Sequence, residues 1–409
     1  MEPTPAGGTK NGGDPVASGL KERVSLHAET EPRPTAACIL GGASPQVWCD
    51  SAAGRLRRGL ARSGITAFLS EGELAATGVP VLLLRGDAVI DGPLLQALLK
   101  APGAVLLSNG EAAGVPLAAH APAGLAAAAA EVLKGDTAGD LPDGLHATDA
   151  AGLGAAYWEA LRKREEPYAL QVVPERLHAI EWRMFMGTYK GATDLITKYL
   201  WPRPAFHATR FCARLGITPN QVTALSLVLV IAAFWWFWQG AWLPGLLAAW
   251  GMTFLDTVDG KLARITLQSS KWGNVFDHGI DLVHPPFWYW AWAVGLQAGS
   301  HAVRPAELVV LLSVIIAGYV LQRVIEGIAI WRLGLEIHVW RRIDTRFRLI
   351  TARRNPNLVL LTVFTAAGRA DLGLAAVAVW TGVCLLLHIL QLLQGLLAAR
   401  GGKLKSWMA

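Results

Sequence analysis

Four aspartates, Asp256, Asp259, Asp277 and Asp281, stand inside or beside two strongly apolar segments of this sequence. An ionised carboxylate at bilayer depth is costly unless a cation neutralises its charge. Hard oxygen ligands, with no cysteine or paired histidine beside them, favour Mg²⁺ or Mn²⁺ over zinc. The four side chains therefore predict a site for two divalent cations, which would also bind a diphosphate.

The spacing of the aspartates places each pair on one helical face. Asp256 and Asp259 are three residues apart, and Asp277 and Asp281 are four apart. Residues with these separations are neighbours on a helix surface. We therefore expect two helix ends to bring the four carboxylates into one cluster.

Small residues and one arginine complete the pattern. Gly260 and Ala263 keep space beside the first pair, and Gly273 lies on the same stripe as the second pair, where helices or a substrate can approach closely. Arg264 carries a planar guanidinium that matches two phosphate oxygens. We expect it to bind the diphosphate.

Read together, the eight residues form the pattern Asp-x2-Asp-Gly-x2-Ala-Arg-x8-Gly-x3-Asp-x3-Asp. This pattern resembles the signature of the CDP-alcohol phosphotransferase family, also called CDP-alcohol phosphatidyltransferases, at every fixed position. The resemblance covers the chain from Phe185 to the C-terminus. It implies a helical membrane fold, a homodimer, and displacement at the β-phosphate of a CDP-linked donor by an alcohol hydroxyl, with release of CMP.

The resemblance also implies a role for each motif residue. Asp256, Asp259, Asp277 and Asp281 are expected to bind the metal ions, and Asp281 also to act as the general base. Residues of the CDP site are expected to be Gly260, Ala263, Arg264 and Gly273.

The aspartates have two other possible interpretations. They could merely cap helices or pair with cations, but Arg264 and Lys261 are too few to neutralise four buried carboxylates. They could also line the permeation path of a divalent-cation transporter. That reading leaves Arg264 unexplained, because it would repel the ion.

Composition indicates a membrane protein. The 409 residues are long enough for two domains, and a 53% hydrophobic content with 17 Trp departs from the soluble norm. The net charge of +6 does not come with any nucleic-acid-binding motif, so no nucleic-acid partner is expected. The four cysteines have neither metal-ligand nor disulfide-framework spacing, which indicates a reducing compartment.

From Asn220 onward we expect six transmembrane helices. They span approximately residues 220–238, 241–260, 274–298, 306–330, 357–368 and 371–398.

The distribution of basic residues predicts the orientation of these spans. Lysines and arginines gather in the connections 260–273 and 332–354 and at the C-terminus, whereas only Arg304 and Arg369 lie on the other side. We therefore expect a multi-pass protein of a bacterial-type inner (plasma) membrane, with both termini and the active site in the cytoplasm.

Residues 185–211, which mix aromatic and basic side chains, are expected to form an interfacial helix on the cytoplasmic leaflet. Thr218 and Pro219 are expected to cap and begin the first span.

The amino-terminal half reads as a disordered tail over residues 1–35, a small α/β Rossmann-like domain over 36–135 and a connection over 136–184. Strand, glycine turn and helix follow one another from Ala36 to Ser63. A second strand ends at Asp87.

This half resembles sugar-phosphate nucleotidyltransferases, which are fused to CDP-alcohol phosphotransferases in bifunctional inositol-phosphate cytidylyltransferases. Gly86-Asp87 followed by Asp91 carries the resemblance. The turn from Gly41 to Gln46 lacks the basic residues that hold a triphosphate. We therefore expect a degenerate domain, and a membrane core that acts alone when the chain begins near Glu175.

Other charged residues are weaker candidates. His284 could touch the acceptor, because it lies three residues after Asp281, but His284 and His278 are more simply packing residues. Arg323 and Glu326 are expected to pair with each other. Four arginines could bind either an anionic acceptor or anionic lipid headgroups: Arg341, Arg342, Arg346 and Arg348.

The sequence thus predicts a phospholipid-synthesis transferase that uses a CDP-activated donor and an alcohol acceptor. CDP-diacylglycerol with a small polar alcohol is the first expectation for the substrates. The amino-terminal domain favours the alternative, CDP-inositol with an inositol phosphate or a lipid as acceptor.

Overall fold

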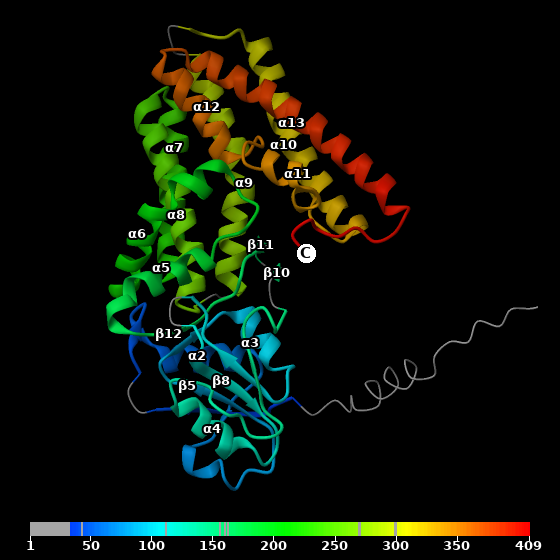
Figure 1. The fold of residues 1–409 in the computed structure, drawn as a ribbon. Coiled ribbons are helices and arrows are strands. Elements are labelled where there is room, and N and C mark those ends of the chain that lie inside the picture. Colours follow the sequence, from blue (N-terminus) through cyan, green and yellow to red (C-terminus); the bar gives the residue numbers. More distant parts are fainter. Residues whose placement is uncertain are drawn as a thin grey trace, which may run out of the picture.

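The structure, a computed structural model, describes residues 33–41, 44–110, 113–154, 157–158, 161, 163–268, 271–297 and 301–409. Most of the expected tail over residues 1–35 lies outside these ranges, as do Gly42 and Ala43 of the glycine turn. Figure 1 shows an α/β unit below a group of long helices, with α2 beneath the lower ends of α8 and α9.

The α/β unit is built on a six-stranded sheet. Its strands, in spatial order, are β4 (Ala67–Phe68), β1 (Ala36–Leu40), β5 (Val81–Arg85), β8 (Pro116–Ala121), β7 (Ala104–Leu107) and β9 (His146–Thr148). β1 runs parallel to β4 and β5, and β7 runs parallel to β9, but β8 is antiparallel to both its neighbours. The predicted α/β domain is therefore present, with a mixed sheet in place of the all-parallel Rossmann arrangement.

Helices cover both faces of this sheet because β5 is apolar on both. Leu82 and Leu84 share a core with α2 (Ala52–Arg62) and α3 (Gly92–Leu98), whereas Val81 and Leu83 share another with α4 (Ala126–Lys134). Successive side chains of a strand point to opposite faces, so a continuous apolar run is what a doubly covered strand requires.

The segment expected as a connection, residues 136–184, also contributes strands. β9 joins the main sheet, and β12 (Ala169–Gln171) pairs with β6 (Ala88–Ile90). The other short antiparallel pairs are β2 (Gln46–Val47) with β3 (Asp50–Ser51) and β10 (Tyr157–Trp158) with β11 (Lys163–Arg164). The α/β unit therefore extends beyond residue 135.

The helical part begins with α5 (Leu177–Gly187), a π-helical turn (Ile196–Leu200) and α6 (Pro202–Arg214). The interfacial segment is thus two helices rather than the single helix expected over residues 185–211. Pro202 and Pro204 explain the break, since proline lacks an N–H donor and suits the first turn of a helix better than its interior.

The remaining helices are α7 (Pro219–Trp238), α8 (Trp242–Ile265), α9 (Lys271–Leu296), α10 (Pro305–Leu333), α11 (Arg342–Phe347), α12 (Arg354–Ala366) and α13 (Ala370–Ala399). Single 3₁₀ turns occur at Glu71–Glu73, Pro174–Arg176 and Ile337–Val339. Thr218 and Gln221 form a capping box around Pro219, which confirms the predicted start of α7.

A helix lies over each of the six expected spans. Three of them, α7, α10 and α13, are long and apolar enough to cross a membrane. α12 has only 13 residues, fewer than the roughly 20 that a bilayer core requires. The helices agree with a membrane protein, and the count of six spans stays a prediction.

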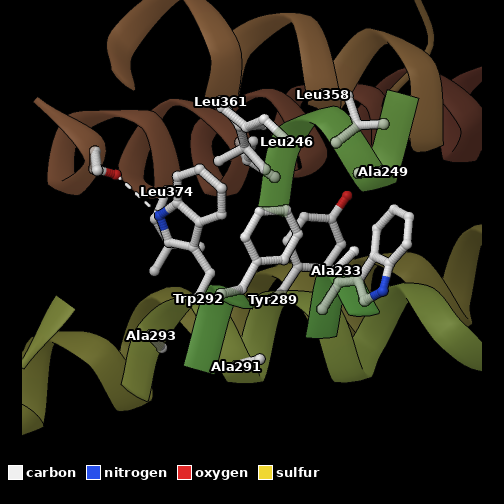
Figure 2. Packing of buried hydrophobic residues seen from close by; sticks show 14 of the residues in the cluster. Ala233, Leu246, Ala249, Tyr289, Ala291, Trp292, Ala293, Leu358, Leu361 and Leu374 are labelled. Atoms are coloured by element: carbon white, nitrogen blue, oxygen red, sulfur yellow. Dashed lines mark hydrogen bonds between the residues drawn. The ribbon is translucent and has the colours of Figure 1, made fainter. Parts of the chain in front are cut away.

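Aromatic side chains of α9 fill the core between the helices. Figure 2 shows Tyr289 and Trp292 pointing from α9 toward Leu246 of α8 and Leu361 of α12. The Trp292 indole N–H donates to the carbonyl oxygen of Ala370 at 3.1 Å, which ties α9 to the start of α13. This packing fixes α9, and with it one half of the aspartate motif, against α8, which carries the other half.

Candidate active site

Three of the four aspartates converge as the spacing predicted. Oxygen atoms of Asp256 on α8 and of Asp277 and Asp281 on α9 all lie within 4.8 Å of one another. They face a cavity of about 940 Å³ whose lining includes all eight motif residues. Two helices therefore present one carboxylate cluster to the same cavity.

Asp259 lines the same cavity beside this cluster. Its Oδ2 accepts a hydrogen bond from the Thr223 hydroxyl of α7 at 2.6 Å. Its Oδ1 is buried and has no hydrogen-bond donor, and Asp259 makes no ion pair, within the part of the chain that the structure describes. A buried carboxylate oxygen without a donor is costly, so this atom fits a cation ligand.

Arg354 of α12 is a site residue that was not predicted from the sequence, where it is one of the basic residues of the connection 332–354. Its guanidinium pairs with both Asp256 and Asp281. The prediction that only Arg264 and Lys261 would be available to neutralise the carboxylates was therefore wrong. Arg354 pairs with only two of the four aspartates. The carboxylate oxygens of all four remain the type of ligand that Mg²⁺ and Mn²⁺ prefer.

The small residues make room as expected. A Cβ atom added at Gly260 would lie 3.1 Å from Nη2 of Arg264, so glycine here leaves space for the guanidinium. The Arg264 Nε is buried without an acceptor among the described residues. Ala263 and Gly273 also line the cavity. This part of the cavity lining thus places the Arg264 guanidinium beside small residues.

A lysine and a tyrosine that were not predicted as site residues stand beside Arg264. Lys261 is only 4% exposed, and its Nζ lies 3.5 Å from the ring centroid of Tyr189. The Tyr189 hydroxyl is buried without a hydrogen-bond partner in the described chain. Both residues line the cavity. The lysine was visible in the sequence inside the motif, but no pattern pointed to Tyr189.

A group of basic residues also lines the cavity. Glu326 of α10 pairs with Arg353 and, at 3.1 Å, with Arg323, which confirms the predicted pairing of Arg323 with Glu326. Arg348 also lines the cavity, and burial beside Arg353 lowers the pKa of Arg348 to about 9. Cations crowded in this way favour an anionic ligand.

The same region holds a second group of potential metal ligands: Glu326, His338 and His388. His338 Nε2 lies 3.1 Å from Glu326, and burial lowers the pKa of His338 to about 3, which keeps its ring neutral. Two guanidiniums already neutralise the Glu326 carboxylate, so a metal ion would compete with both. We do not assign a metal here.

The two histidines near the aspartates behave differently. His284 is buried, with its Nδ1 2.7 Å from the carbonyl oxygen of Ile280 and its ring against Trp288, as a packing residue would be. His278 Nδ1 lies 3.7 Å from Asp277 at the edge of the cavity. His278 is thus closer to the carboxylates than the prediction of a packing residue implied.

In the amino-terminal domain, both carboxylate oxygens of Asp87 accept hydrogen bonds from protein donors. Arg85 donates to both of its oxygens, at 3.0 and 2.9 Å, and Gln171 donates to Oδ2 at 2.9 Å. Burial alone would raise the pKa of Asp87, but these hydrogen bonds hold it below its ordinary value. Both oxygens of Asp87 thus have protein donors, whereas Oδ1 of Asp259 has none among the described residues.

Comparisons with known proteins find similarity in the helical part of the chain. The sequence profile described as CDP-alcohol phosphatidyltransferase matches residues 216–386. The archaetidylinositol phosphate synthase of Pyrococcus horikoshii is 44% identical over 70 residues, which are 17% of this chain and 37% of that protein. The phosphatidylinositol phosphate synthase of Cutibacterium acnes is 34% identical over 74 residues, 17% of this chain and 33% of its own. The chain thus spans about a third of the length of these curated relatives.

Among solved structures, phosphatidylinositol phosphate synthase of Mycobacterium tuberculosis with CDP-DAG bound is 18% identical, with a TM-score of 0.38. The match covers 46% of this chain and 94% of that one. The same enzyme in complex with manganese and citrate gives a TM-score of 0.36 at 18% identity, over 46% of this chain and 87% of that one.

Proposed function

We propose that this chain transfers a substituted phosphate from a CDP-activated donor to an alcohol, with release of CMP, because residues 216–386 match the CDP-alcohol phosphatidyltransferase profile. The observation that carries the proposal is the meeting of Asp256, Asp277 and Asp281 at one cavity, with the donor-free Oδ1 of Asp259 beside them. A cation in this cavity would supply the missing partner of that buried oxygen.

The reaction is a displacement at phosphorus. The acceptor oxygen bonds to the β-phosphorus of the donor, the bond from that phosphorus to the bridging oxygen breaks, and CMP leaves with the bridging oxygen. Asp281 takes the proton of the hydroxyl; its side chain is 41% exposed, more than that of Asp256 at 19%, so an acceptor reaches it more easily. Arg264 binds the diphosphate, beside the space left by Gly260, Ala263 and Gly273.

The aspartates are proposed to hold two divalent cations, Mg²⁺ or Mn²⁺, with Asp256, Asp259, Asp277 and Asp281 as ligands. Such ions, when bound, neutralise the charge that develops on a departing CMP.

For the donor we propose CDP-diacylglycerol, and for the acceptor a phosphorylated polyol of the inositol phosphate type. The names of two relatives support the product class: the archaetidylinositol phosphate synthase of Pyrococcus horikoshii and the phosphatidylinositol phosphate synthase of Cutibacterium acnes. Arg323, Arg348 and Arg353, which also line the cavity, supply cations for a second phosphate. The alternative is CDP-inositol as donor.

The test supplies purified full-length protein with labelled CDP-diacylglycerol or CDP-inositol. Each donor is combined with inositol phosphate, inositol, glycerol phosphate or glycerol, and CMP is quantified. We expect CMP only with CDP-diacylglycerol, and most with inositol phosphate. CMP from CDP-inositol alone would support the alternative donor, and no CMP with any pair would reject the transferase.

We also propose that the protein lies in the inner (plasma) membrane as a homodimer, with both termini and the carboxylate site in the cytoplasm. Activity reporters placed after Lys405 and within residues 341–354 should both give a cytoplasmic signal. A periplasmic signal at either place would overturn the orientation. Mass measurement in detergent should give twice the mass of one chain.

A further inference from the structure

The amino-terminal domain contacts the end of α8, the helix that carries Asp256 and Arg264. Arg55 Nη1 of α2 donates to the carbonyl oxygen of Ile265 at 2.6 Å, and Arg62 Nη2 donates to that of Leu267 at 2.6 Å. The last carbonyl groups of a helix lack donors within the helix and carry partial negative charge, so cations are favourable there. Helix α2 thus caps α8 from more than 200 residues away in sequence.

The backbone that the two arginines hold folds back onto the motif. Leu267 has a φ of 55°, a left-handed conformation that is unfavourable for a side chain of this size. The next amide, that of Gln268, donates to the carbonyl oxygen of Ala263 at 3.1 Å. The Thr266 amide and hydroxyl both donate to Leu262 at 2.8 Å. The position of this turn is therefore coupled to Ala263 and to its neighbour Arg264.

A buried tryptophan keeps α2 in this position. Trp48, only 2% exposed, precedes α2 and has its ring 6.1 Å from Phe185 of α5 and 5.4 Å from Phe206 of α6. Its amide donates to the buried carboxylate of Glu181 at 3.0 Å. The same apolar cluster includes Val258, Leu262 and Ile265 along α8. The contact between the domains is therefore a packed apolar core, which holds α2 and its two arginines in place.

We infer that α2 is a positioning element for the transferase site, in which Arg55 and Arg62 hold the end of α8 so that Ala263 and Arg264 meet the donor diphosphate. This inference rests on the proposed function. It runs against the sequence-based expectation that the membrane core acts alone, because a chain that begins near Glu175 lacks both arginines. Neither arginine touches the cavity, so their effect is through α8.

The first test measures backbone protection in the full chain, without substrate. In Arg55→Met/Arg62→Met, the amides of Thr266 and Gln268 should exchange with deuterium at least about tenfold faster than in the wild type, while those of α13 are unchanged. The control is Arg57→Met, an exposed arginine of the same helix that stacks on Phe68 within its own domain. Unchanged exchange at residues 266–268 in the double variant would overturn the inference.

The second test measures CMP release. A small misplacement of a binding group can cost about 10²-fold in rate, so we expect kcat/KM to fall at least about fivefold in the double variant and to stay at the wild-type value in Arg57→Met. Arg55→Lys should recover part of the loss, because it restores a cation at the helix end. If Arg55→Met does not fold, Arg62→Met with its exposed side chain still decides the question.

The two proposals fail separately. A wild-type protein that releases no CMP would reject the transferase, yet the exchange measurement would still test the cap. Wild-type CMP release combined with unchanged kcat/KM in the double variant would reject the positioning role alone.

Discussion

Asp87 of the amino-terminal domain and the carboxylate cluster of the helical domain each carry a family resemblance in the sequence, but their oxygens have different partners. Arg85 and Gln171 occupy both oxygens of Asp87. In the cluster, one guanidinium, that of Arg354, serves two carboxylates, and Oδ1 of Asp259 has no donor among the described residues. A carboxylate oxygen that faces a cavity and has no donor therefore indicates a metal site more reliably than the position of an aspartate after a buried strand does.

The largest effect should come from neutralising one aspartate of the cluster. Asp256→Asn, Asp259→Asn or Asp277→Asn should lower CMP release by at least about 10³-fold, because each removes a ligand charge while keeping the side-chain volume. Asp87→Asn is the matched control and should retain wild-type release per folded molecule. Equal losses in Asp87→Asn and Asp277→Asn would erase the distinction between the two regions.

The guanidiniums of the two regions offer a second contrast. Arg354→Met leaves Asp256 and Asp281 unpaired, which typically costs about 3–5 kcal/mol for buried charges. Thermal unfolding should therefore occur at a lower temperature without metal, and Mg²⁺ should raise the midpoint by more than in the wild type. Arg85→Met should show no added response to Mg²⁺, since Asp87 is a single carboxylate. The same Mg²⁺ response in Arg354→Met as in the wild type would contradict this account.

Two lysines that each stack on a tyrosine test whether the cavity wall binds the donor. Lys261→Met should raise the KM for the donor about tenfold and change kcat less, because a buried amino group facing the cavity is lost. Lys198→Met removes an exposed lysine that stacks on Tyr199, and should leave KM unchanged. An unchanged KM in Lys261→Met would remove this residue from the site.

The smallest effect on turnover is expected at Asp91, a buried carboxylate that caps a helix. Burial raises the pKa of Asp91 from 3.8 to about 6, although its oxygen caps α3 at Gly92. Because the folded-state pKa of Asp91 lies above the unfolded one, its contribution to the free energy of unfolding should be greatest below about pH 4. That contribution should decline as the pH rises to about 6. Asp91→Asn should remove that slope, raise the midpoint at pH 7 by a few degrees, and leave CMP release unchanged.

The aspartate cluster could be predicted because its members are close in sequence and the helical period fixes their common face. Arg354 could not, since it lies 98 residues from Asp256 and 73 from Asp281, and only the packing of α12 brings it there. The same holds for Arg55, which meets Ile265 across 210 residues. Local patterns gave α2, β1 and β5 correctly, whereas the antiparallel direction of β8 depends on pairings that no short pattern specifies.

The most direct test of the central claim is Mn²⁺ binding to the full-length protein, measured together with CMP release. The wild type and Asp87→Asn should bind two Mn²⁺ per chain and release CMP from CDP-diacylglycerol, and EDTA should abolish that release. Asp277→Asn should bind fewer ions and release none. Undiminished Mn²⁺ binding in Asp277→Asn, or CMP release at the wild-type rate in EDTA, would contradict the assignment of the carboxylate cluster as the metal-dependent transferase site.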